Sequence, residues 1–87
     1  MQSMPIKNPS KQDLEDRLKK VKFYRLDGNE YIIMRDLVTH ILGTTYHKFS
    51  KFRRNKKFLD SEPSLVLGYW NYYTRKQAKN LYAALYL

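Results

Sequence analysis

The segment from residue 44 to residue 58 places aromatic and basic side chains on different faces of one predicted helix. No Asp or Glu occurs at positions 37–59, and the basic residues there are Lys48, Lys51, Arg53, Arg54, Lys56 and Lys57. At about 100° per residue, a helix over 46–57 gathers Tyr46, Phe49 and Phe52 into one apolar stripe. Such a helix is stable only when the stripe packs on a core, which turns its cations toward solvent or a polyanion.

The face opposite the stripe carries donors suited to phosphate oxygens and to the edges of guanine and adenine. It comprises His47, Lys48, Lys51, Arg54 and Asn55. Arg53 and Lys56 fall on the apolar side, so either the helix ends near residue 54 or both side chains extend past the core. Because a solvated surface usually mixes charges of both signs, the missing acids favour a nucleic-acid contact over a plain surface helix.

Turn and cap residues divide the rest of the chain into short elements. Ser10, Thr45 and Thr74 are candidate N-caps, and Asp27-Gly28 between β-rich segments is typical of a two-residue hairpin turn. Gly43 is expected just beyond a helix end. After a flexible arm at residues 1–9, the predicted elements are helix 10–21, strands 22–26 and 30–34, helix 35–42, helix 46–57, strands 65–67 and 69–73, and a helix after Thr74.

Size and composition favour one small domain, residues 10–87, without catalytic chemistry. A chain of 87 residues with 43% hydrophobic and 15% aromatic side chains can form a small core. It has no cysteine, so disulfides and thiolate metal sites are excluded. Its two histidines, His40 and His47, lack metal-ligand spacing, and no glycine-rich phosphate loop or nucleophile–base pattern occurs. We therefore expect no metal, no cofactor and no catalytic residue.

The charge balance restricts the partners. A net charge of +9 favours nucleic acid, an anionic membrane or an acidic protein. No apolar run approaches the ~20 residues that span a bilayer, and the N-terminal residues lack the apolar stretch of a signal peptide. We therefore expect no membrane partner and a cytoplasmic protein, nucleoid-associated or in a host cytoplasm or nucleus.

The hairpin over 65–73 and the cations after it form a second candidate contact. As a wing, it would lay Tyr69 and Trp70 along the DNA backbone. Arg75 and Lys76 begin the last helix, where cations oppose the helix dipole and would suit a nearby phosphate. Alternate aromatic residues in a strand are nevertheless more often core than ligand platform, so both interpretations of Tyr69 and Trp70 stay open.

The order of the elements resembles the winged-helix domains of MerR-type regulators and of phage or transposon excisionases. The resemblance covers residues 30–86. It rests on a strand ending in Tyr31-Ile32-Ile33-Met34, the helix over 35–42, Gly43, the basic helix 46–57, the hairpin 65–73 and the helix opened by Tyr72-Tyr73-Thr74-Arg75-Lys76-Gln77-Ala78. The first helix and hairpin precede the family pattern, and the loop 58–64 is long for it.

This resemblance implies a small α+β winged helix-turn-helix domain that binds double-stranded DNA. Helix 46–57 would lie in the major groove and the 65–73 hairpin on the adjacent backbone. The absence of an effector domain implies a small regulator or recombination accessory factor. The predicted DNA contacts are Thr45, His47, Lys48, Lys51, Arg54, Asn55, Lys56, Lys57, Tyr69, Trp70, Arg75 and Lys76.

The same residues are also compatible with partners other than double-stranded DNA. A domain this small makes few base contacts, so a homodimer or cooperative assembly is expected to supply specificity. One alternative function is a basic viral or plasmid protein that docks on an acidic surface of a host protein. Another is RNA binding through the same basic surface.

Overall fold

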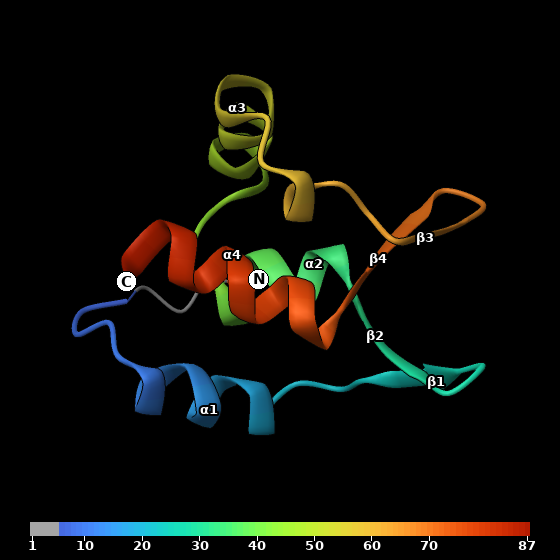
Figure 1. The fold of residues 1–87 in the computed structure, drawn as a ribbon, viewed down its shortest axis with the longest axis horizontal. Helices are drawn as coiled ribbons and strands as arrows, with labels where there is room; N and C mark the ends of the chain where they lie inside the picture. Colours follow the sequence, from blue (N-terminus) through green and yellow to red (C-terminus); the bar gives the residue numbers. More distant parts are fainter. Residues whose placement is uncertain (1–5) are drawn as a thin grey trace.

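Two β-hairpins, each followed directly by a helix, make up most of the structure (Figure 1). The computed structural model describes residues 6–87. The first unit consists of β1 (Tyr24–Leu26), β2 (Asn29–Ile33), α2 (Met34–Asp36) and η1 (Leu37–Ile41). The second consists of β3 (Leu65–Leu67), β4 (Trp70–Thr74) and α4 (Arg75–Tyr86). Before the first unit comes α1 (Lys11–Lys19), and between the two units come α3 (Tyr46–Lys56) and η2 (Leu59–Ser61).

The two hairpins join into one curled antiparallel sheet. The strand order is β1-β2-β4-β3, and the central pairing sets Ile32 opposite Tyr73. Each of these two residues is the fourth of a five-residue strand and is fully buried. The central strands β2 and β4 therefore pair symmetrically about Ile32 and Tyr73, although the helices that follow them differ. The hairpin ends diverge on the right of Figure 1.

Turn and cap residues act as predicted. Asp27 and Gly28 both have positive φ values, 51° and 81°, as a type I′ hairpin turn requires. Gly68, with φ of 63°, begins the turn between Leu67 and its partner Trp70. The Ser10 hydroxyl accepts the amide of Asp13 at 3.0 Å to begin α1, and Thr74 forms a capping box with Gln77.

The core lies between the sheet and its helices. It comprises Leu14, Leu18, Ile32, Met34, Leu37, Val38, Ile41, Leu42, Phe49, Tyr73, Ala78, Leu81 and Tyr82. The Tyr73 hydroxyl donates to the Ser61 carbonyl at 2.7 Å, and burial raises the pKa of Tyr73 to about 12. This phenol therefore stays neutral and keeps its donor. Tyr82 accepts the Ser10 amide at 3.2 Å, which ties the start of α1 to α4.

The structure differs from the prediction in three local places. The segment 35–42 is not one α-helix, because the Leu42 amide donates five residues back, to Leu37 at 2.9 Å. The first helix ends at Lys19 rather than at residue 21. The predicted arm lies outside the described residues up to position 5, and Ile6 packs against the core, so this end of the arm is not free.

One buried amide holds the loop that follows α3. Gln77 is 8% exposed, and its Nε2 donates to the Glu62 carbonyl at 2.7 Å. Its Oε1 accepts from the Ser64 hydroxyl at 2.6 Å and from the Thr74 amide at 2.9 Å. A single side chain on α4 thus sets where β3 begins.

The predicted α+β class is confirmed, and none of the helices within residues 6–87 is long and apolar enough to cross a membrane.

Candidate nucleic-acid interface

Helix α3 stands away from the rest of the molecule, at the top of Figure 1. Its N-cap is Thr45, whose hydroxyl accepts the amide of Lys48 at 3.2 Å. It ends where Lys57 adopts a left-handed conformation, with φ of 50°. Phe49, 1% exposed, is its only buried residue. A helix held by so little core leaves most of its circumference available for contact.

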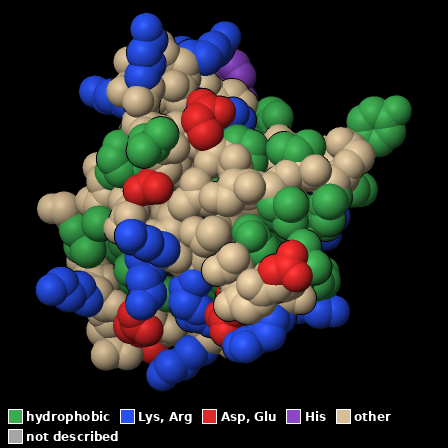
Figure 2. Space-filling view, turned by 45° about the vertical axis from the view of Figure 1, so that its right-hand side comes forward, with side chains coloured by type: hydrophobic (Ala, Val, Ile, Leu, Met, Phe, Trp, Pro, Cys, Tyr) green, Lys and Arg blue, Asp and Glu red, His purple; other side chains and the backbone are tan. Residues whose placement is uncertain are grey.

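The predicted DNA-contacting side chains of α3 are all on the surface. His47, Lys48, Lys51, Arg54, Asn55, Lys56 and Lys57 are exposed. Within residues 6–87, none of the five cations among them forms an ion pair with a carboxylate. Figure 2 shows Lys and Arg side chains around this end of the molecule. Unneutralised charge held on a folded helix is suited to a polyanion.

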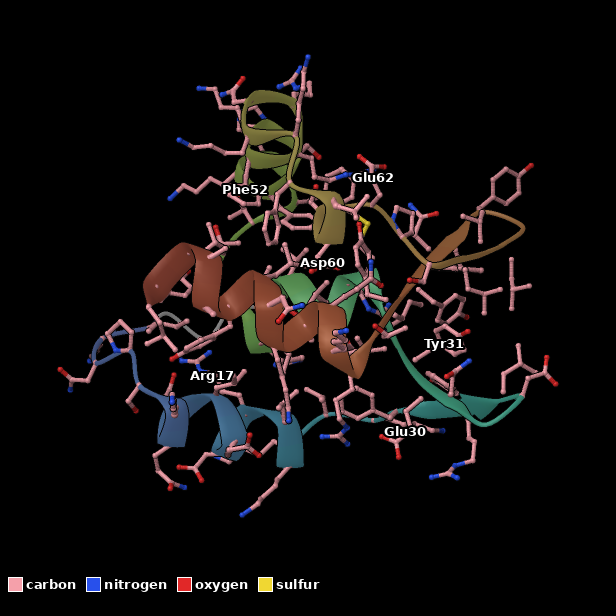
Figure 3. All side chains as sticks on the ribbon, in the orientation of Figure 1. Arg17, Glu30, Tyr31, Phe52, Asp60 and Glu62 are labelled. Atoms are coloured by element: carbon pink, nitrogen blue, oxygen red, sulfur yellow. The ribbon has the colours of Figure 1, made fainter. Side chains whose placement is uncertain are left out.

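Arg53 and Lys56, both predicted on the apolar side of the helix, have different surroundings in the structure. Since α3 continues to Lys56, the alternative that the helix ends near residue 54 is wrong. Arg53 turns back toward the body and donates to Glu62 at 2.8 Å, with 23% of its side chain exposed. Lys56 is exposed. Figure 3 shows Glu62 beside the lower part of α3, where it accepts from Arg53.

The predicted apolar stripe of α3 is wrong at one position. Tyr46 is 63% exposed, whereas Phe49 is buried and Phe52 is partly buried. The Phe49 ring stacks on Phe52 at 6.5 Å and meets Tyr73 edge-on at 6.0 Å. The core reaches α3 along this Phe49–Phe52 line. Tyr46 lies beyond that line.

A groove runs along the exposed side of α3. Its walls come from Tyr46, His47, Ser50, Arg53, Arg54, Lys57 and Glu62. Apart from Glu62, which is paired with Arg53, the charged groups of this groove are cationic. The groove therefore offers a cationic surface beside an exposed tyrosine.

The second hairpin presents two aromatic side chains to solvent. Tyr69, at the turn, is 101% exposed, and Trp70 is 54% exposed. The core interpretation of these two residues is therefore wrong. Tyr73, on the same strand, is the residue that enters the core. Because strand side chains alternate between faces, only one side of β4 could be buried against the helices.

Arg75 and Lys76 lie away from α3, beside the first hairpin. The Arg75 Nε donates to Glu30 at 2.9 Å, and its guanidinium lies 4.1 Å from the centre of the Phe23 ring. These contacts account for a cation at the start of α4 without a phosphate. Lys76 is exposed and lies beside the same recess as Glu30. The sequence alone did not indicate the Arg75–Glu30 ion pair, because the two residues are 45 positions apart.

The Glu30–Arg75 pair predicts an acid-dependent loss of stability. The hydrogen bond and positive charge of Arg75 lower the pKa of Glu30 from its ordinary value of 4.5. A lowered pKa stabilises the fold fully above about pH 4.5, and this contribution is lost as the pH falls through the lower folded value. In urea unfolding at about pH 6 and about pH 3, we expect Glu30→Gln to lose less stability on acidification than the parent. Equal losses would show that the pair adds nothing.

One face of the sheet is apolar, and no helix within residues 6–87 covers it. It is lined by Tyr24, Leu26, Tyr31, Leu65, Leu67 and Tyr72, around a recess of about 220 Å³. Tyr24 meets Tyr72 edge-on at 6.2 Å, and Figure 3 shows Tyr31 in the opening between the hairpins. Figure 2 shows hydrophobic side chains gathered over both hairpins. Exposed apolar area of this kind commonly marks a contact with another molecule.

The geometry thus offers a cationic helix, a solvent-exposed aromatic hairpin and an apolar sheet face. Comparison with protein-family models, curated proteins and solved structures gave no match. Within residues 6–87, no group of three or more His, Asp or Glu side chains is placed to hold a metal ion.

Proposed function

We propose that this chain is a non-catalytic protein that binds double-stranded DNA through α3. The helix lies in the major groove, and the β3–β4 hairpin contacts the adjacent backbone as a wing. The observation that carries the proposal is the exposed, unpaired cationic face of α3, with Lys51 and Arg54 at its centre. Its biological role is that of a small regulator or a recombination accessory factor, as the resemblance implies.

The order and pairing of the elements support a winged-helix arrangement. Strand β2, a short helical segment, α3 and the β3–β4 hairpin follow one another in the order of the family pattern. The hairpin returns to pair with β2 through β4, so the turn at Gly68 projects from the same sheet that carries the helices. The proposed contacts are the α3 residues with Tyr69 and Trp70. Arg75 and Lys76 are left out, because Glu30 pairs with Arg75 and both residues lie beside the first hairpin, away from α3.

The strength of binding should fall steeply with salt. Five cations on α3 displace counterions from five phosphates, so log K should fall with log salt at a slope near −4.5. Fluorescence anisotropy from about 50 to about 300 mM salt measures this slope on duplex DNA, single strands and duplex RNA. We expect duplex DNA to bind best, because A-form RNA closes its major groove to side chains. A preference for duplex RNA would favour the RNA alternative, and no binding at low salt would exclude α3 as a nucleic-acid contact.

The apolar sheet face favours a second candidate function, association with another protein chain. A second copy of the chain would cover Tyr24, Leu26 and Leu67, whereas an acidic host protein would dock on the cationic face of α3. Salt weakens DNA binding and binding to an acidic protein alike, so salt dependence cannot distinguish the two. Competition with DNA can. Duplex DNA displaces a partner bound on α3 and leaves a partner bound on the sheet face in place.

A further inference from the structure

Three exposed aromatic side chains surround one recess between α3 and the second hairpin. Tyr46 comes from the first turn of α3, and Tyr69 and Trp70 come from the hairpin turn and β4. The recess has a volume of about 230 Å³, and Met34 and Arg35 also line it. Two segments more than twenty residues apart in the chain thus both contribute residues to its lining, and the Tyr69 side chain itself is fully exposed to solvent.

The exposure of these rings is not explained by the fold. Tyr46, Tyr69 and Trp70 are 63%, 101% and 54% exposed, so they add little to the core. Large aromatic rings gain most of their stabilisation from burial against another surface. Their convergence on a recess points to a ligand with a planar apolar face.

The recess adjoins the cationic groove of α3. Tyr46 lines both, so a ligand lying along Arg54 and Lys57 reaches the aromatic recess without leaving the surface. Arg35 also lines the recess. Its side chain is 60% exposed and its Nε lies 3.8 Å from the Asp36 carboxylate, a long ion pair that leaves most of the guanidinium accessible to a phosphate. The charge of both surfaces suits a polyanion, and the rings suit its planar groups. A nucleic acid strand combines the two properties.

We propose that this recess binds one unpaired nucleobase of a DNA strand held on α3. The base stacks on the Trp70 ring, and the fully exposed Tyr69 side chain turns in from solvent to cover it. Tyr46 closes the side toward α3, and Arg35 meets the phosphate. A volume of about 230 Å³ is smaller than the roughly 300–1,000 Å³ of sites for larger ligands, so one ring system is accommodated. The inference rests on the proposed function and deepens it, because it names a structural feature of the DNA.

The preferred DNA is then a duplex with one unpaired base beside the bound segment. Extruding a paired base costs free energy, and the cost is least where the base is already unpaired. Base–aromatic stacking changes affinity by about 5- to 100-fold when the ring is removed. We therefore expect a duplex with a single unpaired thymine to bind about 5- to 100-fold more tightly than the fully paired duplex of the same length.

The only tryptophan of the chain, Trp70, reports directly on the recess. In titrations of the full chain, the duplex with the unpaired thymine should quench tryptophan fluorescence more strongly than the paired duplex does. Anisotropy on the same two duplexes gives the ratio of their affinities. Tyr69→Ala should bring this ratio close to one. Tyr24→Ala, which removes a 44% exposed tyrosine from the first hairpin, is the matched control and should leave the ratio unchanged.

The outcomes separate this inference from the proposed function. Equal affinity for the two duplexes, or a preference that survives Tyr69→Ala, overturns the base-binding recess and leaves duplex binding in place. No binding to either duplex overturns both. Circular dichroism of Tyr69→Ala checks the fold, and the full exposure of that side chain removes any packing reason for unfolding.

Discussion

Replacing Lys51 and Arg54 together by Ala should lower the affinity for duplex DNA by about 10- to 100-fold. Both side chains are exposed and neither forms an ion pair within the described part of the chain. Losing two phosphate contacts should also flatten the salt slope by about 1.8, from near −4.5 to near −2.7. Alanine is a good helix former, so α3 stays folded and the loss reports contact alone.

A matched double variant separates contact from net charge. Lys11→Ala with Lys19→Ala removes two exposed positive charges from α1, which is a different helix. We expect this variant to keep the parent slope, since non-contacting charges release no phosphate counterions. Anisotropy across salt concentrations measures both variants. If the Lys51 and Arg54 variant is folded and binds like the parent, α3 is not the recognition helix.

Phe49→Ala should destabilise the fold by about 3–5 kcal/mol. The Phe49 side chain is 1% exposed and is the buried contact through which α3 meets Tyr73 of the sheet. In a domain of this size, each kcal/mol lowers the Tm by about 4–8 °C, so a drop of at least about 12 °C is expected. A domain this small is expected near the low end of the usual stability of about 5–15 kcal/mol. The loss then leaves the variant partly unfolded, and DNA binding should fall with it.

Tyr46→Ala is the control for this result. Tyr46 lies one turn earlier on the same helix but is 63% exposed, so its removal should change stability by less than about 1 kcal/mol. Thermal and urea unfolding compare the two variants. Equal destabilisation would mean that α3 is anchored along the whole stripe predicted from sequence, and that Tyr46 is held by the body.

Local elements could be read from the sequence because their causes are local. Asp27-Gly28 supplies the two positive φ values of a type I′ turn, and the Ser10 and Thr45 hydroxyls cap the helices that follow them. Each depends on the conformation of a few adjacent residues. The cationic face of α3 was predictable for the same reason, since residue spacing along a helix determines which side chains share a face.

Only the tertiary structure decided which side chains the rest of the molecule buries. The helical stripe included Tyr46, but the body reaches α3 only at Phe49 and Phe52. The pairing of β2 with β4, which sets Ile32 opposite Tyr73, joins segments about forty residues apart, and no local rule specifies such a pairing.

The sequence by itself therefore determined the turns, the caps and the charged face of α3, because each follows from neighbouring residues. The tertiary structure decided which aromatic side chains are buried and which stay exposed. Tyr73 enters the core and Tyr69 faces solvent, although both belong to the same aromatic segment. It also decided that Arg75 is held by Glu30 while the cations of α3 stay unpaired, because an ion pair depends on which distant segments the sheet brings together.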